Sequence, residues 1–337
     1  MKRTLKIVIP MAGWGTRMRP HTWSKPKPLV GVAGKPSFDH LMDMFQSIPA
    51  DFDIEFVFII SPYLGEQIPV YVEKHYPSIK ANYIVQDEMK GQSHAIWLSR
   101  KLIEGPTIVI FSDTLLDTDF SFLSTFQYDG VAWVKPVPDP RRFGVAVVDA
   151  DQNIQKLIEK PTELENNLVV VGCYYFKNGA DLVKAVDRQL EENIQLKGEF
   201  FLADAINLML KGGSKMTIQP VEVWLDTGTI EATLETNRFM LDHGKDNSSK
   251  AAQIPNVRVI SPVFVHPNAR VSNSIIGPHV SIGANCVIEN TIISNSIVDE
   301  GSEVRNTALQ GSFIGRNTKV DGTPKTINIG DNSILNI

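Results

Sequence analysis

The chain has 337 residues, of which 43% are hydrophobic and 21% charged, values that are ordinary for a globular protein with a sizeable core. Its formal net charge of −5 argues against a surface built to bind nucleic acid. No stretch reaches the roughly 18 apolar residues of a membrane span, so we expect no membrane contact. Cys173 and Cys286 lack metal or redox spacing, so we expect reduced cysteines in a cytoplasmic protein.

The N-terminal part of the chain predicts strands that alternate with helices. The expected strands are 7–9, 54–61, 80–86 and 107–113, and the expected helices between them are 37–48, 65–75 and 93–102. The strands are almost continuously apolar, as in strands that are buried on both faces. This alternation indicates an α/β fold with a doubly wound, mostly parallel, Rossmann-like sheet.

The loop after the first strand combines glycines with cations, in VIPMAGWGTRMRPHTWSKPKP at residues 8–28. Gly13 and Gly15 allow backbone N–H groups to approach a phosphate closely, because no Cβ stands in the way. Arg17 and Lys27 carry the charge that neutralises a phosphate. A local basic loop on an acidic chain favours a small anionic ligand over a polyanion.

Two further segments are expected beside this loop, because ligands of open α/β sheets bind at the carboxyl ends of the strands. One runs from Gln86 to Gly91, and the other ends on Asp113. A second carboxylate, Asp226, lies in Trp-Leu-Asp-Thr-Gly-Thr before a glycine turn. Two carboxylates near a phosphate loop are what Mg²⁺ needs, although each aspartate alone also fits a plain turn or helix cap.

Between about 129 and 176 the pattern becomes rich in strands, which predicts an insertion that closes over the edge of the sheet. Helices are then expected at 178–190, 200–211 and 230–242. The polar segment 243–255 is typical of a linker.

The C-terminal part of the chain has a different periodicity. From Val259 to Val320 an aliphatic residue recurs every five or six positions, with Gly, Asn and Ser between. The full set is Val259, Val265, Val271, Ile276, Ile282, Ile288, Ile293, Val298, Val304, Leu309, Ile314 and Val320. This period predicts a β-helix of hexapeptide repeats with roughly four coils, because three short strands make one triangular coil. We therefore expect domains at 1–242 and 256–337, joined by 243–255.

These motifs together resemble the signature of the sugar-phosphate nucleotidyltransferases. The resemblance rests on AGWGTRMRPHT followed by KPKPLV, and on FSDTLLD, IEKP, VVVGCYYF and WLDTGT in the same order. The repeats match the longer members of that family, which carry a left-handed β-helix after the catalytic domain. The chain is most similar to the glucose-1-phosphate thymidylyltransferases, with the uridylyl enzymes close behind.

The resemblance implies a role for each matching position. The triphosphate would lie on Ala12, Gly13, Gly15, Thr16 and Arg17, with Arg17 on the departing pyrophosphate and Lys27 near the reacting centre. Gln86 and Gly91 would read the edge of a pyrimidine, and Asp113 and Asp226 would hold Mg²⁺. The hexose would contact Gly144, Glu159 and Gly172, and Lys160 would hold the phosphate of the sugar 1-phosphate.

The expected activity is nucleotidyl transfer from a nucleoside triphosphate, with dTTP or UTP favoured, to a sugar 1-phosphate, with glucose 1-phosphate favoured. Two alternatives stay open at this point. One is a catalytically inactive regulatory protein that binds nucleotide sugars on the same fold. The other is a bifunctional enzyme with an acetyltransferase in the β-helix. The flat faces of a β-helix also suit subunit packing, so we expect a homo-oligomer.

Overall fold

The computed structural model describes residues 2–322, and the chain divides into two compact units. The sheet unit comprises Met1–Val30 and Pro36–Ala232, and the coil unit comprises Gly31–Lys35 and Thr233–Ile337. The division falls inside helix α6 (Ile230–Met240), some residues before the predicted boundary at 242. Residues 323–337 of the predicted second domain lie outside the described residues.

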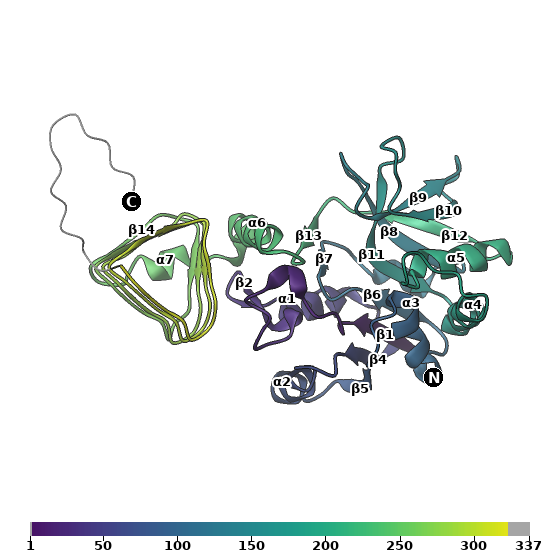
Figure 1. Ribbon diagram of the computed structural model, residues 1–337, viewed down its shortest axis with the longest axis horizontal. Coiled ribbons are helices and arrows are strands. Elements are labelled where there is room, and N and C mark those ends of the chain that lie inside the picture. Colours follow the sequence, from purple (N-terminus) through teal and green to yellow (C-terminus); the bar gives the residue numbers. More distant parts are fainter. Residues whose placement is uncertain (1, 323–337) are drawn as a thin grey trace. The chain divides into compact units, whose positions relative to one another are not determined.

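A mixed sheet with the strand order β10-β9-β11-β6-β1-β4-β5 forms the centre of the sheet unit (Figure 1). Its parallel part comprises β1 (Arg3–Pro10), β4 (Phe52–Ile60), β5 (Lys80–Val85) and β6 (Thr107–Ile110). The other strands are β8 (Gly130–Pro136), β9 (Gly144–Val148), β10 (Ile154–Glu159), β11 (Leu168–Phe176) and β12 (Met216–Pro220). A small antiparallel pair joins β7 (Thr114–Leu116) to β13 (Trp224–Asp226).

Helices cover both faces of this sheet, as the apolar strands predict. They are α1 (Ser37–Met44), α2 (Gln67–His75), α3 (Gln92–Leu98), α4 (Gly179–Glu191) and α5 (Leu202–Lys211). Short 3₁₀ turns lie at Thr16–Met18, Lys27–Leu29, Phe45–Ser47, Arg100–Leu102 and Ser121–Ser124. Val8 of β1 and Val57 of β4 belong to one core with α3, α4 and α5. Phe58 of β4 instead packs on Phe38 of α1, so successive residues of the strands serve opposite faces.

Two predictions for this unit are wrong. The strands between 129 and 176 are no insertion over the sheet edge, because β11 pairs antiparallel with β6 and extends the central sheet. Apolar strands alone do not reveal their partners, so the sequence did not distinguish these two arrangements. The strand expected at 107–113 ends at Ile110, and Asp113 lies in the turn that Thr114 closes by donating its N–H to the Phe111 carbonyl oxygen (3.1 Å).

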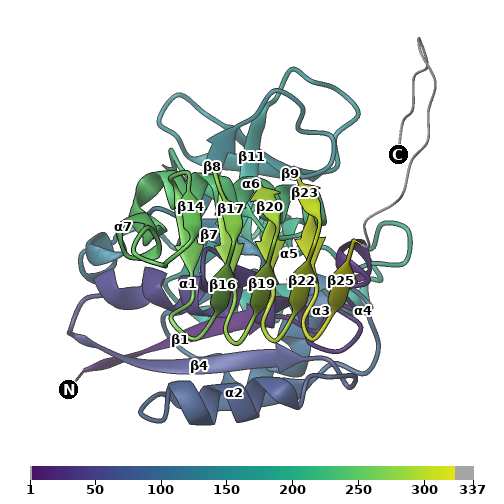
Figure 2. The ribbon, with the colours of Figure 1, turned by 90° about the vertical axis from the view of Figure 1, so that its left-hand side faces the viewer.

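The coil unit is a left-handed β-helix of hexapeptide repeats. Its strands form three parallel sheets, which appear as the sides of a triangle in Figure 1 and as adjacent rungs in Figure 2. The first sheet contains β14 (Val257–Val259), β17 (Ser274–Ile276), β20 (Ile292–Ser294) and β23 (Ala308–Gln310). The second contains β15 (Val263–Val265), β18 (Val280–Ile282), β21 (Ile297–Val298) and β24 (Phe313–Ile314). The third contains β16 (Arg270–Ser272), β19 (Val287–Glu289), β22 (Glu303–Arg305) and β25 (Lys319–Asp321).

All of the aliphatic positions that gave the period point into one core. In the first sheet, Val259, Ile276, Ile293 and Leu309 stand opposite one another on successive rungs. The other two sheets contain the equivalent columns Val265, Ile282, Val298, Ile314 and Val271, Ile288, Val304, Val320. Every member is buried in the coil core or packs against it, which confirms the prediction of a hexapeptide β-helix.

The predicted linker 243–255 contains structure of its own. A wide turn covers Leu241–Lys245, and the short helix α7 follows at Ser248–Ala251. Ala251 belongs to the core of the coils, and α7 lies within the outline of the triangle in Figure 1 and beside β14 in Figure 2. The polar and small residues of this segment suggested a linker because most of them are exposed. They did not reveal that the segment also buries residues in the coil core.

The hairpin of β2 (Gly31–Val32) and β3 (Lys35–Pro36) brings an early segment of the chain to the coils. The Ala33 N–H donates to Oδ1 of Asn237 (2.9 Å), and Oγ of Ser281 donates to the same oxygen (2.6 Å). A Cβ on Gly34 would lie 2.5 Å from the ring of Phe264, so only glycine fits there. Residues 31–35 are therefore part of the coil unit, although they lie far from it in the sequence.

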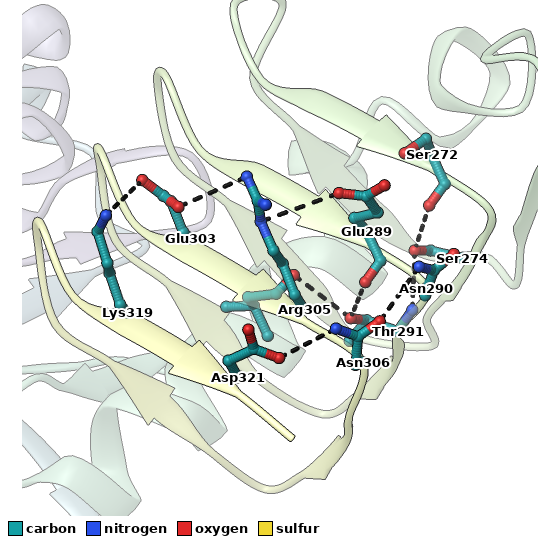
Figure 3. A network of polar contacts seen from close by, with 11 residues as sticks. Ser272, Ser274, Glu289, Asn290, Thr291, Glu303, Arg305, Asn306, Lys319 and Asp321 are labelled. Atoms are coloured by element: carbon teal, nitrogen blue, oxygen red, sulfur yellow. Dashed lines mark hydrogen bonds and ion pairs between the residues drawn. The ribbon is translucent and has the colours of Figure 1, made fainter. Parts of the chain in front are cut away.

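Polar side chains hold neighbouring rungs together on the third sheet (Figure 3). The guanidinium of Arg305 lies 3.9 Å from the Glu289 carboxylate on the previous rung and 3.5 Å from Glu303 on its own strand. Lys319 reaches Glu303 from the next rung at 3.2 Å. At a corner, Oγ of Ser274 accepts the N–H of Thr291 (3.1 Å), which lies one rung further on. Among the described residues, no helix is long and apolar enough to cross a membrane.

Candidate active site

The loop after β1 presents unused backbone donors. Within the described chain, the N–H groups of residues 12–17 donate to no other protein group, which is rare for so many consecutive residues. Gly15 has a φ of +59°, and its carbonyl oxygen accepts the hydroxyl of Thr22 (2.8 Å). A Cβ on Gly13 would meet no atom within 4 Å, so this part of the loop is open. Successive free N–H groups around such a turn form a concave site for an anion.

Aromatic side chains that the sequence did not point to support this loop. Trp14 stacks on Tyr63, with the ring centroids 6.2 Å apart. The hydroxyl of Tyr63 donates to the backbone carbonyl oxygen of Trp23 (3.1 Å), further along the same loop. Because Tyr63 follows β4, the next strand in the sheet, it fixes the loop against the carboxyl edge. In the sequence, only the presence of Trp14 and Trp23 in the loop indicated this support.

Gln86 and Gly91 are in contact with each other. Nε2 of Gln86 donates to the Gly91 carbonyl oxygen (3.3 Å) and lies 3.3 Å from Nδ1 of His94. Gly91 has a φ of +99°, and a Cβ there would lie 2.6 Å from the carbonyl oxygen of Phe200. The glycine is thus required by the close approach of two backbones. The structure places this pair after β5, on the same sheet edge as the loop after β1.

Asp113 and Asp226 come together through the small β7–β13 pair. Asp226 stands opposite Thr114, the residue after Asp113. The N–H of Thr227 donates to the carbonyl oxygen of Asp113 (3.1 Å), which ties the two segments side by side. The ammonium of Lys27 forms an ion pair with Oδ2 of Asp113. Residues far apart in the sequence therefore meet at one point, as the crevice rule predicts.

The two carboxylates have pKa values shifted in opposite directions. Burial alone would raise the pKa of Asp113, but the charges of Lys27 and Arg17 outweigh it and hold that pKa below its ordinary value. Burial, with the negative charge of Asp113, raises the pKa of Asp226, although the Gly228 N–H bonds to its carboxylate at 2.6 Å. A site with two such carboxylates favours a cation between them.

A cavity of about 190 Å³ opens beside this pair. Of the predicted site residues, its wall contains Arg17, Asp113, Gly144, Glu159, Gly172 and Asp226. These residues come from the loop after β1, the turn after β6, the β9–β10 pair, β11 and β13. Arg17, the two predicted metal ligands and the predicted hexose residues thus line a single cavity, whereas Ala12, Gly13, Gly15 and Thr16 are not part of its wall. Lys27, Gln86, Gly91 and Lys160 are not part of its wall.

The glycines of the wall make room for functional groups. Gly144 stands opposite Glu159 in the β9–β10 pair, and a Cβ on it would lie 3.0 Å from Oε2 of Glu159. Gly172 has a φ of +84° at an irregularity in β11, and a Cβ there would lie 2.6 Å from the ring of Phe111. Burial raises the pKa of Glu159, with further effects from nearby Asp204 and Glu199 acting against Lys160.

Lys160 immediately follows β10 and is exposed. Its backbone has a φ of +48°, and its N–H donates to the Phe143 carbonyl oxygen (2.9 Å). Its ammonium lies 4.5 Å from the centroid of the Phe201 ring, where a cation–π contact holds it. The structure therefore does not bring this cation to the wall that the hexose residues form.

Several wall residues were missed by the reasoning from sequence. Arg142 and Phe143 immediately precede Gly144, and Tyr174 and Trp224 lie close to Gly172 and Asp226 in the sequence. The Phe143 and Trp224 rings pack edge to face, with centroids 5.1 Å apart. Their proximity to predicted residues was a usable signal. Only the alternation of side chains along a known strand would have shown which of them face the cavity.

The donor set suits a hard cation that is shared with a substrate. Among the described residues, no group of three or more His, Cys, Asp or Glu side chains is placed to hold a metal ion. Asp113 and Asp226 form a pair of carboxylates instead. Mg²⁺ commonly binds one or two carboxylates and completes its shell with water and substrate phosphates. The chemistry of this pair therefore fits Mg²⁺, with Lys27 competing for Asp113.

Comparison with known proteins agrees with the family resemblance seen in the sequence. Residues 6–243 match the family model described as nucleotidyl transferase, and residues 259–336 match the GMPPB C-terminal domain. A bifunctional protein GlmU from Methanocaldococcus jannaschii is 31% identical over 98% of this chain and 77% of its own length. A glucose-1-phosphate thymidylyltransferase from Streptomyces griseus is 26% identical over 95% of each chain.

The fold has a counterpart among solved structures. A crystal structure from Bacillus anthracis, assigned as a glucose-1-phosphate thymidylyltransferase and in complex with a sucrose, superimposes with a TM-score of 0.58. It is 24% identical and covers 70% of this chain and 94% of its own, so it supports the architecture alone. With the family match spanning residues 6–243, the chain belongs to the nucleotidyl transferase family and is a nucleotidyltransferase of the sugar-phosphate type.

Proposed function

We propose that the chain transfers the nucleotidyl group of a nucleoside triphosphate to a sugar 1-phosphate and releases pyrophosphate. We favour dTTP or UTP as the donor and glucose 1-phosphate as the acceptor. The cavity carries this proposal, because Arg17 and the Asp113–Asp226 pair lie in one wall with Gly144, Glu159 and Gly172. Cations and carboxylates for phosphate chemistry are thus combined with groups suited to hexose hydroxyls.

The reaction requires a sugar phosphate oxygen to attack the α-phosphorus in line with the departing pyrophosphate. No covalent intermediate is needed, so the protein has to hold two mutually repelling anions and stabilise the charge between them. The free N–H groups of residues 12–17 bind the triphosphate, and Arg17 takes the pyrophosphate. Lys27 contacts the phosphates at the reacting centre, for which it exchanges its pairing with Asp113.

We further propose that Asp113 and Asp226 hold Mg²⁺. The neighbouring charge of Asp113 contributes to the raised pKa of Asp226, and a cation bound to both relieves that repulsion. A bound Mg²⁺ supplies positive charge for the phosphate oxygens of the substrates. Both aspartates lie in the cavity wall, so a cation bound to them is accessible to the phosphates of a substrate in the cavity.

The preference for a pyrimidine nucleotide rests on Gln86 and on the name of the Streptomyces griseus relative. A glutamine amide offers both a donor and an acceptor to the edge of a base. In the structure its Nε2 is engaged with Gly91 and His94, so a bound base has to use the remaining capacity of the amide or displace one of these contacts.

The test is pyrophosphate release in the presence of Mg²⁺, with dTTP, UTP, ATP, GTP and CTP each paired with glucose 1-phosphate and two other sugar 1-phosphates. We expect release with dTTP or UTP and glucose 1-phosphate. Turnover with a purine nucleotide alone would keep the reaction and remove the role of Gln86. An absence of release with every pair would favour a binding protein without activity.

The surroundings of the two cysteines fit a reducing compartment. Cys173 and Cys286 are both free and buried, and burial raises the pKa of each thiol, which keeps them unreactive. We therefore propose a cytoplasmic enzyme. We also propose a homo-oligomer that associates through a face of the coils, to be tested by light scattering of the full chain.

A further inference from the structure

Gln86, to which the motif pattern assigns the base of the nucleotide, has a fixed backbone. Its N–H donates to the carbonyl oxygen of Ile60 (3.0 Å), which continues the pairing of β4 with β5 past Val85. The residue is buried, with 5% of its surface exposed. Because Oε1 only accepts and Nε2 only donates, what a base meets here depends on which way the amide is turned.

The side-chain nitrogen of Gln86 lies between two acceptors. The Gly91 carbonyl oxygen and Nδ1 of His94 are each 3.3 Å from Nε2. The Gly91 oxygen is shared, because it also accepts the N–H of Ala95 (3.2 Å) in the first turn of α3. The other acceptor belongs to a side chain, that of His94. Oε1 of Gln86 bonds to no group between residues 2 and 322, so it is left for a ligand.

The imidazole of His94 is in the state that can accept. Burial lowers the pKa of His94, and the charge of Lys90 acts in the same direction, against the charge of Glu88 and a hydrogen bond to its backbone. The ring is therefore neutral at neutral pH, and a neutral imidazole carries a lone pair on one of its nitrogens. With the proton on Nε2, Nδ1 accepts from the Gln86 amide.

Neighbouring side chains hold this imidazole in place. Trp97, one turn further along α3, stacks on His94 with the two ring planes 19° apart. Nε1 of Trp97 donates to the carboxylate of Asp187 in α4 (2.9 Å). The guanidinium of Arg100 lies over the Trp97 ring, 3.8 Å from a ring centroid. The plane of the His94 ring is thus set by contacts that do not involve the nucleotide.

The segment that carries these groups runs along the cavity. Gln92, the first residue of α3, is part of the cavity wall, and its Oε1 accepts the N–H of Leu202 (3.3 Å). Gly91 directly precedes it, and the Gly91 N–H donates to no group between residues 2 and 322. A nucleotide in the cavity then has an acceptor, Oε1 of Gln86, and a donor, the Gly91 N–H, within one short segment.

We propose that His94 is a positioning residue that sets the base preference. By accepting from Nε2 it keeps the Gln86 amide turned so that Oε1 is presented to the base, where it accepts the N3–H of uracil or thymine. Cytosine has a lone pair at N3 in place of this N–H, so the same orientation of the amide rejects it. The proposal rests on the proposed function and extends it by naming a residue that selects the base.

The test compares His94→Leu, which removes the acceptor, with His94→Asn, which keeps one. Oδ1 of an asparagine is the same number of bonds from Cα as Nδ1 of a histidine. Arg100→Ala is the control, since it changes the far side of the Trp97 ring. Steady-state kinetics are measured with Mg²⁺ while the nucleotide and glucose 1-phosphate are varied in turn. The nucleotides are dTTP, UTP, CTP and N3-methyluridine triphosphate, which lacks the N3–H.

We expect His94→Leu to raise the KM for dTTP and UTP by about three- to tenfold, as for one lost hydrogen bond, with little change in the KM for glucose 1-phosphate. The preference for UTP over CTP and over the N3-methyl analogue should fall, because an amide that is free to turn also presents Nε2 to the base. His94→Asn should recover most of the loss, and Arg100→Ala should behave as the parent protein does.

Three results would overturn the assignment. An unchanged KM for UTP in His94→Leu would show that Gly91 alone orients the amide. Equal losses in His94→Leu and His94→Asn, with an unchanged preference for UTP over CTP, would reduce His94 to a structural role. Turnover with purine nucleotides alone would keep nucleotidyl transfer and remove Gln86 and His94 from base selection. Circular dichroism checks that each variant is folded.

Failure of this assignment is distinguishable from failure of the proposed function. If the parent protein turns over no nucleotide with any sugar 1-phosphate, the proposed function is wrong. Calorimetric titration of the full chain with UTP then decides on His94 alone. Weaker binding by His94→Leu than by His94→Asn and Arg100→Ala upholds the oriented amide, and equal binding by the three variants overturns it.

Discussion

Asp113 and Asp226 are neighbours whose pKa values are shifted in opposite directions. We expect Asp113→Asn, Asp226→Asn and Lys27→Ala each to lower the turnover number by about a hundredfold or more, because each removes a charge that acts on the reacting phosphates. Pyrophosphate release at saturating substrates measures the effect, with urea unfolding as the control for folding. Turnover close to that of the parent protein in any variant would remove that residue from the mechanism.

The raised pKa of Asp226 also predicts a conflict between activity and stability. The folded state holds this proton more tightly than the unfolded chain does. The free energy of unfolding therefore falls as the pH rises through the folded pKa, and the ionised carboxylate weakens the fold at neutral pH. Asp226→Asn keeps a side-chain oxygen for the Gly228 N–H and removes the charge.

We therefore expect Asp226→Asn to be more stable than the parent protein at neutral pH without Mg²⁺. The difference should disappear in acid, below the ordinary pKa of an aspartate, where both proteins are uncharged at this position. Urea unfolding over a series of pH values measures it. A variant that is less stable at every pH would show that the carboxylate is stabilised by its surroundings.

At the residue scale, sequence reasoning found the groups whose chemistry is tied to a motif. Asp113, Glu159 and Asp226 line one cavity because each ends or follows a strand, and strand ends are readable from an apolar pattern. It did not anticipate Lys160 over Phe201 or Arg142 in the wall. The direction of a long side chain depends on φ and on neighbours from other strands, which one sequence does not specify.

At the scale of single elements, Gly172 connects the path of β11 to the shape of the cavity. We expect Gly172→Ala to reduce both stability and turnover, because a methyl group at φ +84° would also lie 2.6 Å from the Phe111 ring. Gly198 is the matched control, since its φ is +85° and a Cβ there would meet nothing within 4 Å. Gly198→Ala should cost only the backbone strain, about 1–2 kcal/mol.

Urea unfolding and pyrophosphate release on both glycine variants separate strain from crowding. If Gly172→Ala and Gly198→Ala lose the same stability and keep the same turnover, Phe111 moves aside without effect on the cavity. A larger loss for Gly172→Ala in both measurements would establish that Gly172 shapes the site.

Buried hydroxyls at the corners of the coils give a second prediction for elements. Oγ of Ser302, which is fully buried, donates to the Gly315 carbonyl oxygen (2.6 Å) and accepts the N–H of Thr318 (3.1 Å). We expect Ser302→Ala to destabilise the protein by about 1–3 kcal/mol, because the half-buried N–H of Thr318 loses its acceptor. Ser312→Ala removes only an exposed contact to Gln310 and should change stability by less than about 0.5 kcal/mol.

Thermal unfolding followed by circular dichroism compares the two serine variants. Equal stability would mean that Thr318 finds another acceptor in place of Ser302. The regular coils were the most predictable elements in the chain, because each inward position repeats a simple steric requirement. The mixed part of the sheet was the least predictable, because β11 pairs with strands on both sides that lie far from it in the sequence.

At the scale of the whole molecule, Gly31–Lys35 prevents a clean separation at the predicted boundary. A chain that ends at residue 242 keeps Asn237 and loses Phe264 and Ser281, against which the hairpin region is built. We expect this truncated chain to be less stable than the full chain and to have a lower turnover number, because Lys27 lies just before the hairpin. Unfolding and pyrophosphate release test this, and full stability of the truncated chain would contradict it.

The same five residues affect how the protein is made. Gly31–Lys35 leaves the ribosome early, but Phe264, whose ring packs against Gly34, emerges only after the whole sheet unit has been synthesised. Domains generally fold as units from the N-terminus during synthesis, so this segment stays without its partners while the strands of the sheet unit are already pairing. Chain order thus leaves this early segment of the coil unit without its packing partners until the C-terminal part of the chain is translated, and a ribosome that stalls before residue 264 leaves the hairpin uncovered.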